Sequence, residues 1–214
     1  MANEQLEKYL KLARRAREEN NSEDAKRYYD MVRTEDPDNV EARYFYAYYR
    51  VWDGKKGECY GNFVDFRKVF TTVVRSVSEW EVEMSEKESL IQAIFHSASG
   101  LVLSVRKIQT ELWEASSKAQ NTSDANKYND QKKKVEKSGI EMMYALGDDI
   151  EKYFADNETL KAVKLSAWKK GAEFNQQFPY CGIDKTAIET YVAKIKQIEP
   201  SYEPPKKAGC ISFG

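Results

Sequence analysis

The chain has 214 residues, and its 34 lysines and arginines nearly balance 35 aspartates and glutamates. This balance argues against a strongly basic protein that binds nucleic acid or an anionic membrane through its overall charge. Glycine and proline are scarce, at 10 and 5 residues, and no long stretch alternates β-branched with polar side chains, so we expect an all-α fold.

The first 54 residues predict two complete helices and a third. Residues 3–19 form the first, with apolar side chains at helical spacing up to Ala16. Ser22, followed by two acidic residues, is the expected N-cap of the second helix, which ends before Pro37. The third helix begins near Val40 and ends near Gly54. A fourth helix is predicted to run on to Val77, because no proline follows the apolar positions 63–77.

Small and large residues in this segment follow a repeating order. The members of the pattern are Tyr9, Leu12, Ala13 and Ala16, then Ala25, Tyr29 and the closing Pro37. The pattern resembles a tetratricopeptide repeat, and a shift by that family's period of about 34 residues places Tyr46 on Leu12, Ala47 on Ala13, Cys59 on Ala25 and Phe63 on Tyr29. The resemblance covers roughly residues 6–70 and implies stacked helical hairpins that present a binding surface and seldom carry chemistry.

The middle of the chain predicts a long antiparallel helical hairpin over residues 84–156. Ser85 with Glu88 has the spacing of a capping box, and apolar heptads continue from Ile91 to Ala119. A turn follows at residues 121–124, where Ser123 or Asp124 is the expected cap of the next helix. Residues 115–135 are too polar to be buried, so we expect the tip of the hairpin in solvent.

Two further helices are predicted over residues 157–178 and 184–198, and three prolines then favour a flexible tail over residues 200–214. The predicted organisation is therefore a single all-helical domain over residues 1–199. It consists of tetratricopeptide-like hairpins (6–78), the long hairpin (84–156) and closing helices (157–199).

Catalytic chemistry has little support in the sequence. His96 is the only histidine, and beside an apolar heptad it is most simply a boundary residue. The spacings of zinc proteases, paired-cysteine zinc sites, calcium loops and phosphate-binding loops are absent. We therefore expect no enzyme, no cofactor and no metal.

Two runs of lysines do not change this view. Lys132, Lys133 and Lys134 form one run, and Lys161, Lys164, Lys169 and Lys170 form the other. Aromatic residues are not interleaved with these lysines in a stacking pattern. Solvated helix faces explain both runs, so we expect neither nucleic acid nor a membrane as a partner.

The third predicted helix carries the strongest binding signal, because aromatic side chains lie almost all around it. Tyr44, Tyr48 and Trp52 fall on the side that the repeat family uses as its inner groove. The matching face of the first helix offers Leu10, Arg14 and Arg17, and an arginine pair of this kind suits a carboxylate. The alternative is that the long hairpin fills this groove and the aromatic residues form core.

Three functions follow, and the leading one is an interaction protein that binds a peptide or protein in the groove. A second is a structural protein that forms a homodimer through the heptads of the long hairpin. A third is an enzyme or small-ligand protein with a pocket between the hairpin and the last helices. The lack of a secretory signal, of any long apolar run and of a paired set of cysteines predicts a cytoplasmic location.

Overall fold

A computed structural model describes residues 2–178 and 185–204. These residues form α-helices and one short 3-10 turn, without a strand, so the all-α prediction is confirmed. The chain divides into two compact units, an N-terminal unit (Met1–Leu90) and a C-terminal unit (Ile91–Gly214). The two units are described separately below, and the single domain of the sequence interpretation stays a prediction.

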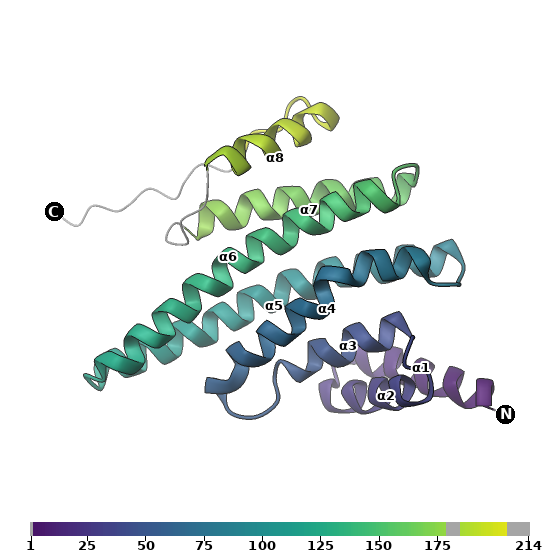
Figure 1. Cartoon of the computed structure of the whole chain (residues 1–214), viewed down its shortest axis with the longest axis horizontal. Coiled ribbons are helices and arrows are strands. Elements are labelled where there is room, and N and C mark those ends of the chain that lie inside the picture. The colour runs from purple at the N-terminus through teal and green to yellow at the C-terminus, as the bar shows by residue number, and fades with distance from the viewer. Residues whose placement is uncertain (1, 179–184, 205–214) are drawn as a thin grey trace. The chain divides into compact units, whose positions relative to one another are not determined.

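The N-terminal unit is a series of consecutive helical hairpins. Its helices are α1 (Ala2–Glu18), α2 (Ser22–Glu35), α3 (Val40–Arg50) and α4 (Cys59–Glu79), with the 3-10 turn η1 (Lys56–Glu58) before α4. Helix α1 packs against α2, α2 against α3, and α3 against α4 (Figure 1). The first turns of α5 (Met84–Lys118) complete this unit.

Aromatic side chains form much of the core of the N-terminal unit. Tyr29 of α2 stacks on Phe45 of α3 with ring centroids 5.2 Å apart, and both rings are buried. Phe63 and Phe66 of α4 are also buried, and Phe66 meets the edge of Tyr44 at 5.5 Å. Small residues at Ala13, Ala25 and Ala42 are completely buried and let the helix backbones approach closely.

The turn between α1 and α2 corrects the predicted cap. Asn20 is left-handed (φ 57°), and the Asn21 N–H bonds back to the Ala16 carbonyl at 2.8 Å, which closes the end of α1. The Asn21 side chain then accepts a 3.2 Å hydrogen bond from the Asp24 N–H. Asn21 is therefore the N-cap of α2, and the predicted Ser22 is its first residue.

The same turn occurs again between α5 and α6 (Thr122–Tyr153), in the C-terminal unit. Gln120 is left-handed (φ 56°), and the Asn121 N–H bonds to the Ser116 carbonyl at 2.9 Å. The Asn121 side chain accepts from the Asp124 N–H at 3.2 Å. Asn121 is thus the N-cap, and the two predicted caps, Ser123 and Asp124, lie within the first turn.

The predicted capping box at the start of α5 is also wrong. The helix begins at Met84, and the Glu83 carbonyl accepts the first bonds, from the Glu86 and Lys87 N–H groups. Ser85 lies inside the helix, where its backbone carbonyl accepts a 2.9 Å bond from the Ser89 hydroxyl. The helix has 35 residues and ends at Lys118, which agrees with the predicted start of the hairpin at residue 84 and its turn at residues 121–124.

In the C-terminal unit, α5 from Ile91 onward and α6 run antiparallel. Ser99 contacts Met143, and Arg106 contacts Glu136. Residue numbers therefore increase along α5 where those of the contacting residues of α6 decrease. The Glu136 carboxylate is completely buried and accepts a 2.7 Å bond from Arg106 Nε. Between these pairs, Gly139 lies directly against Val102, which leaves no room for a side chain.

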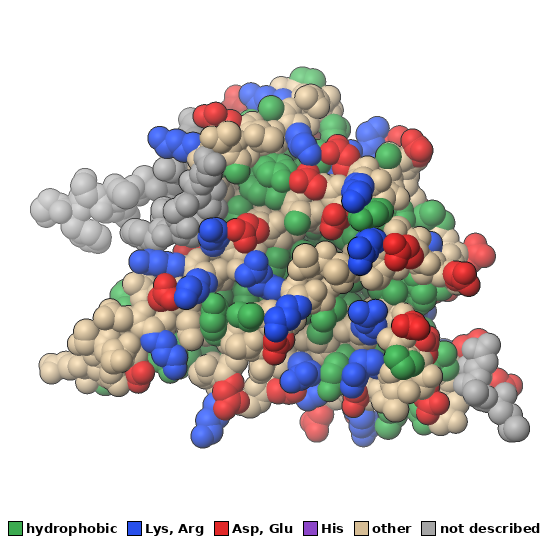
Figure 2. Space-filling model, in the orientation of Figure 1, with side chains coloured by type: hydrophobic (Ala, Val, Ile, Leu, Met, Phe, Trp, Pro, Cys, Tyr) green, Lys and Arg blue, Asp and Glu red, His purple; other side chains and the backbone are tan. Residues whose placement is uncertain are grey.

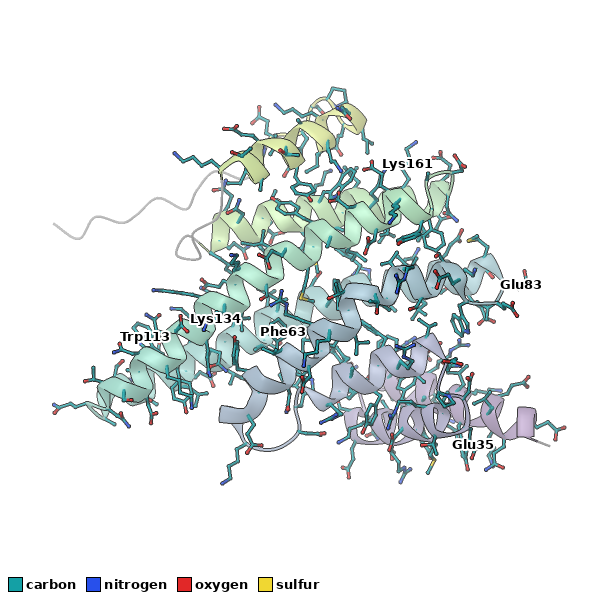
Figure 3. All side chains as sticks on the ribbon, in the orientation of Figure 1. Glu35, Phe63, Glu83, Trp113, Lys134 and Lys161 are labelled. Atoms are coloured by element: carbon teal, nitrogen blue, oxygen red, sulfur yellow. The ribbon has the colours of Figure 1, made fainter. Side chains whose placement is uncertain are left out.

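The tip of this hairpin is polar, as predicted from its composition. Most residues between 114 and 134 are exposed or half-buried. Trp113 and Lys134 lie on the two helices close to the tip (Figure 3). The Lys132 ammonium lies 4.7 Å above the Trp113 ring, so one lysine of the predicted basic run is held against an aromatic face.

The remaining helices of the C-terminal unit are α7 (Glu158–Gln177), which packs on α6, and α8 (Lys185–Ile198), which packs on α7. Asp148 of α6 joins all three helices. Its carboxylate accepts hydrogen bonds from Trp168 Nε1 (3.1 Å), the Tyr191 hydroxyl (2.5 Å) and Lys194 Nζ (2.8 Å). The predicted tail extends beyond Pro204, and residues 205–214 lie outside the described residues.

Candidate functional site

A pocket of the N-terminal unit lies among α2, α3 and α4. Its volume is about 500 Å³, within the range of sites that hold small ligands or a few peptide residues. The side chains around it come from one stripe on each of two helices and from the end of a third. They are Arg33, Thr34 and Pro37; Arg43, Tyr46, Ala47 and Arg50; and Asn62, Asp65, Phe66 and Val69.

Helical spacing explains why these side chains share one pocket. The α3 residues lie at positions i, i+3, i+4 and i+7, and the α4 residues repeat the same spacing, so each set lies on one face of its helix. The base of the pocket is apolar, because Phe66 is 1 % exposed and packs against Phe70 at 6.1 Å. The exposed residues Arg43 and Arg50 form the rim.

Tyr46 lies between two guanidinium groups. The Arg33 guanidinium is 4.3 Å from the centre of the Tyr46 ring, and that of Arg50 is 5.9 Å from it. A 2.6 Å bond from Arg33 to Asp30 is the main reason why the pKa of Arg33 is raised, and it fixes this guanidinium in place. The Arg33 Nε is buried and has no hydrogen-bond partner, so this donor is not satisfied by the protein itself.

Positive charge dominates the lining. Neither Arg43 nor Arg50 forms an ion pair with the part of the chain that the structure describes. Asp65 is the only acidic side chain of the lining, and a hydrogen bond from Lys68 lowers its pKa, with a smaller contribution from the charge of Arg50. The pocket therefore combines an apolar base with an excess of guanidinium donors at its edge.

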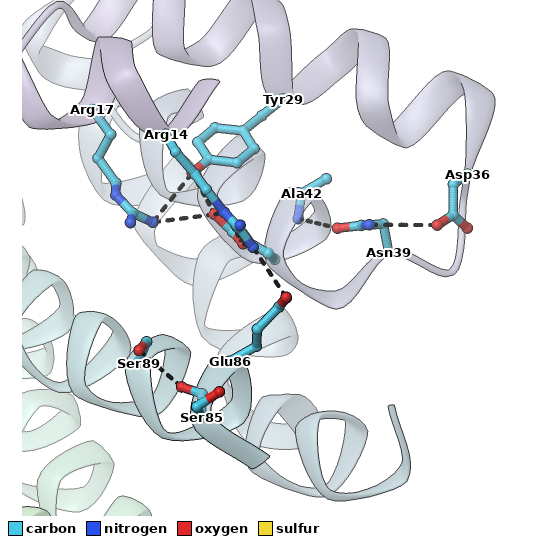
Figure 4. Close-up of polar contacts among 10 residues, drawn as sticks. Arg14, Arg17, Tyr29, Asp36, Asn39, Ala42, Ser85, Glu86 and Ser89 are labelled. Carbon is cyan, nitrogen blue, oxygen red and sulfur yellow. Dashed lines mark hydrogen bonds and ion pairs between the residues drawn. The ribbon is translucent and has the colours of Figure 1, made fainter. Parts of the chain in front are cut away.

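Two arginines of the predicted groove, Arg14 and Arg17, bind a carboxylate that belongs to the protein (Figure 4). Glu41 of α3 is 3 % exposed and accepts from Arg14 Nε at 2.9 Å and from Arg14 Nη2 at 2.6 Å. Arg17 approaches the same carboxylate at 3.4 Å, and the Tyr29 hydroxyl donates to it at 2.8 Å. Arg14 also lies 3.5 Å from Glu86.

This cluster has clear electrostatic consequences. The hydrogen bond to Glu41 raises the pKa of the Arg14 guanidinium, and burial, more than any other cause, raises the pKa of Tyr29. Both groups therefore keep their protons across the physiological range, and the cluster ties α1, α2 and α3 together. A pocket of about 260 Å³ remains beside the two arginines, bordered by Ser85, Glu86, Ser89 and Leu90 of α5.

The other residues of the predicted groove have different surroundings. Tyr44 is completely buried, between Phe45 and Phe66. Tyr48 is half-buried against Phe45, Tyr49 and Phe66, and burial raises its pKa. Leu10 of α1 is half-buried.

Trp52 is 37 % exposed and lines a third pocket, of about 340 Å³, together with Tyr49 and the Lys26–Asp53 ion pair. The six predicted residues thus lie in several environments, with Arg14 and Arg17 in one of these pockets and Trp52 in another. Their role in binding stays a prediction.

The sequence interpretation missed the arginine pocket. One signal was present: Arg43, Tyr46 and Arg50 lie on a single face of α3, and two basic residues with a ring between them are uncommon on a core helix. Arg33 of α2 and Phe66 of α4 converge on this face of α3 because the three helices pack together, and the sequence pattern alone does not show that packing.

Among the described residues, no group of three or more His, Cys, Asp or Glu side chains is placed to hold a metal ion. His96 is exposed, beside the ring of Phe95. Within the described part of the chain, none of the helices has the length and apolar character needed to cross a membrane. The buried Cys59 has its pKa raised to about 11 by desolvation, which keeps this thiol protonated and unreactive.

Charged side chains of both signs are interspersed on the face of the molecule shown in Figure 2.

Comparisons with protein-family models, with curated proteins and with solved structures gave no significant match. The resemblance to tetratricopeptide repeats therefore stays a prediction from the residue pattern.

Proposed function

We propose that this protein is an interaction module that binds a short peptide segment of a partner protein in the pocket among α2, α3 and α4. The observation that carries the proposal is the pocket itself. It is open, it holds about 500 Å³, and it offers an apolar base with unpaired guanidinium groups at its edge. Apolar surface with a few placed polar groups is typical of ligand sites.

The surrounding architecture supports the same proposal. Consecutive hairpins α1–α4 give a rigid frame, in which the buried Glu41 cluster and the Tyr29–Phe45 stack fix α1, α2 and α3. Sites on rigid helices lose little conformational freedom when a ligand binds. Stacked helical hairpins of the tetratricopeptide kind bind peptides in this way, and the residue pattern of 6–70 resembles that family.

Selection from a random peptide library displayed on phage tests the proposal with the full chain. Ala47 is half-buried in the pocket lining, so Ala47→Trp fills the pocket. The matched control is Ala162→Trp, at an exposed position of α7. Selected peptides are expected to lose binding to Ala47→Trp by about tenfold or more and to bind Ala162→Trp as they bind the wild type.

Circular dichroism and thermal unfolding establish first that both variants keep the helical fold. A library that yields no peptide above background contradicts the proposal. Peptides that bind Ala47→Trp and the wild type equally tightly contradict it as well, because their site would then lie elsewhere.

A further inference from the structure

The charges around the arginine pocket indicate the kind of peptide that it accepts. Three arginines and one aspartate line the pocket, and Asp65 is already bonded to Lys68. Arg33 is bonded to Asp30 through one nitrogen, whereas Arg43 and Arg50 make no ion pair with other described residues. The donors that the protein leaves unused are therefore guanidinium groups, which recognise carboxylates and phosphates through paired hydrogen bonds.

The spacing of the two rim arginines sets a distance between anionic groups. Arg43 and Arg50 are seven positions apart on one face of α3, so their backbones are separated by about 10 Å at 1.5 Å per residue. A peptide in the extended polyproline II conformation rises about 3.1 Å per residue with three residues per turn, so anionic side chains three residues apart lie on the same side and span about 9 Å, close to this distance.

The base of the pocket sets a third requirement for the ligand, in addition to its negative charge and the spacing of its anionic groups. Ala47, Phe66 and Val69 form an apolar surface between the arginines, and Tyr46 carries Arg33 on its face at 4.3 Å. An apolar side chain of the ligand, placed between its two anionic residues, covers this surface and removes water from around the ion pairs. Desolvation strengthens those pairs and makes them specific.

We propose that the ligand is an extended acidic peptide, with two anionic side chains about three residues apart and an apolar side chain between them. Arg43 and Arg50 bind the anionic groups, and Arg33 with Tyr46 forms the wall of the site. The proposal rests on the proposed function and specifies its ligand. The anionic group is a carboxylate or a phosphate ester, and the experiment below distinguishes these two sources.

Four synthetic peptides, each labelled with fluorescein and blocked at the C-terminus, serve as probes for the full chain. The first is Ser-Asp-Leu-Ala-Asp-Ser. The second has asparagine in place of both aspartates, the third has phosphoserine there, and the fourth has lysine. Fluorescence anisotropy in about 0.05 M and about 0.5 M NaCl gives the affinities and their dependence on screening.

The aspartate peptide is expected to bind about tenfold more tightly than the asparagine peptide at low salt, and this ratio should shrink at high salt. Arg43→Glu and Arg50→Glu should each weaken its binding by about tenfold, or about 1.4 kcal/mol. Arg75→Glu is the matched control, because Arg75 is an exposed arginine of α4 outside the pocket lining. Tighter binding of the phosphoserine peptide assigns the site to phosphate, and tighter binding of the aspartate peptide assigns it to carboxylate.

Equal binding of the aspartate and asparagine peptides overturns the inference. An effect of Arg75→Glu as large as that of Arg50→Glu overturns it too, because only net charge would then matter. If the asparagine peptide binds as tightly as the aspartate peptide and Ala47→Trp blocks both, the proposed function stands and the ligand class is wrong. If Ala47→Trp changes the binding of none of the peptides, the proposed site itself is wrong.

Discussion

Replacing Glu41 with glutamine removes one charge from the centre of the N-terminal unit and changes the shape of the side chain very little. Glu41 is 3 % exposed, and its carboxylate accepts from Arg14, Arg17 and Tyr29. A glutamine can still accept from Tyr29, but it brings two N–H groups of its own close to the guanidinium donors. The substitution therefore removes the carboxylate that both arginines share, and Arg14 keeps only the Glu86 carboxylate, at 3.5 Å.

The size of the effect follows from the exposure of the partners. Removing one member of a buried ion pair destabilises a protein by about 3–5 kcal/mol, because the charge left behind is desolvated. Arg14 and Arg17 are 37 % and 27 % exposed, so water reaches both guanidinium groups in the variant. We therefore expect the lower end of this range, a loss of about 3 kcal/mol in the free energy of unfolding.

Glu19→Gln, just after the end of α1, is the matched control. Glu19 pairs with Arg15 at 2.8 Å, but the two side chains are 56 % and 73 % exposed, so we expect almost no change in the free energy of unfolding. Urea unfolding measures the change in the free energy of unfolding of the whole chain. Hydrogen exchange of the α1–α3 amides measures the change in local stability, which is needed because a chain of two units need not unfold in one step. Equal effects of Glu41→Gln and Glu19→Gln would refute the structural role of the cluster.

Four further substitutions test the packing and the turns, each by urea unfolding. Asn121→Ala removes the N-cap of α6 and should destabilise the chain by about 1 kcal/mol. Gln120→Gly relieves the backbone strain of a left-handed residue and should stabilise the chain by about 0.5–1 kcal/mol. Effects of the same sign would contradict the turn geometry. Gly147→Ala should destabilise by about 1–3 kcal/mol, because its Cβ would overlap the buried Trp168 ring. Gly100→Ala, where a Cβ meets nothing within 4 Å, should instead stabilise α5 by about 0.5–1 kcal/mol, and a loss of stability there would count against the packing.

The sequence was sufficient for the helices but not for their caps. Periodic apolar positions predicted α5 to within a residue or two at each end, because a helix of 35 residues repeats its signal many times. The predicted N-caps of α2 and α6 lie one to three residues after the observed ones, Asn21 and Asn121. Each observed cap follows a left-handed residue that is not glycine. A left-handed asparagine or glutamine carries no sequence signal as clear as that of glycine.

The candidate site was harder to predict for a different reason. Arg14 and Arg17 were singled out for a carboxylate, and the carboxylate that they contact comes from Glu41, two helices further along the chain. Helical spacing shows which residues share a face, but not which face of the next helix meets them. The pocket around Arg43 and Arg50 depends on that second kind of information.

The reversal of charge at the rim of the pocket tests the central claim most directly. The variant Arg43→Glu/Arg50→Glu replaces both unpaired guanidinium groups with carboxylates, and the lysine peptide, Ser-Lys-Leu-Ala-Lys-Ser, is its complementary ligand. We expect the double variant to bind the lysine peptide about tenfold more tightly than the aspartate peptide, which reverses the order of the wild type. If the double variant keeps the wild-type order, or if it binds both peptides as the wild type does, these two arginines do not select the ligand and the account is wrong.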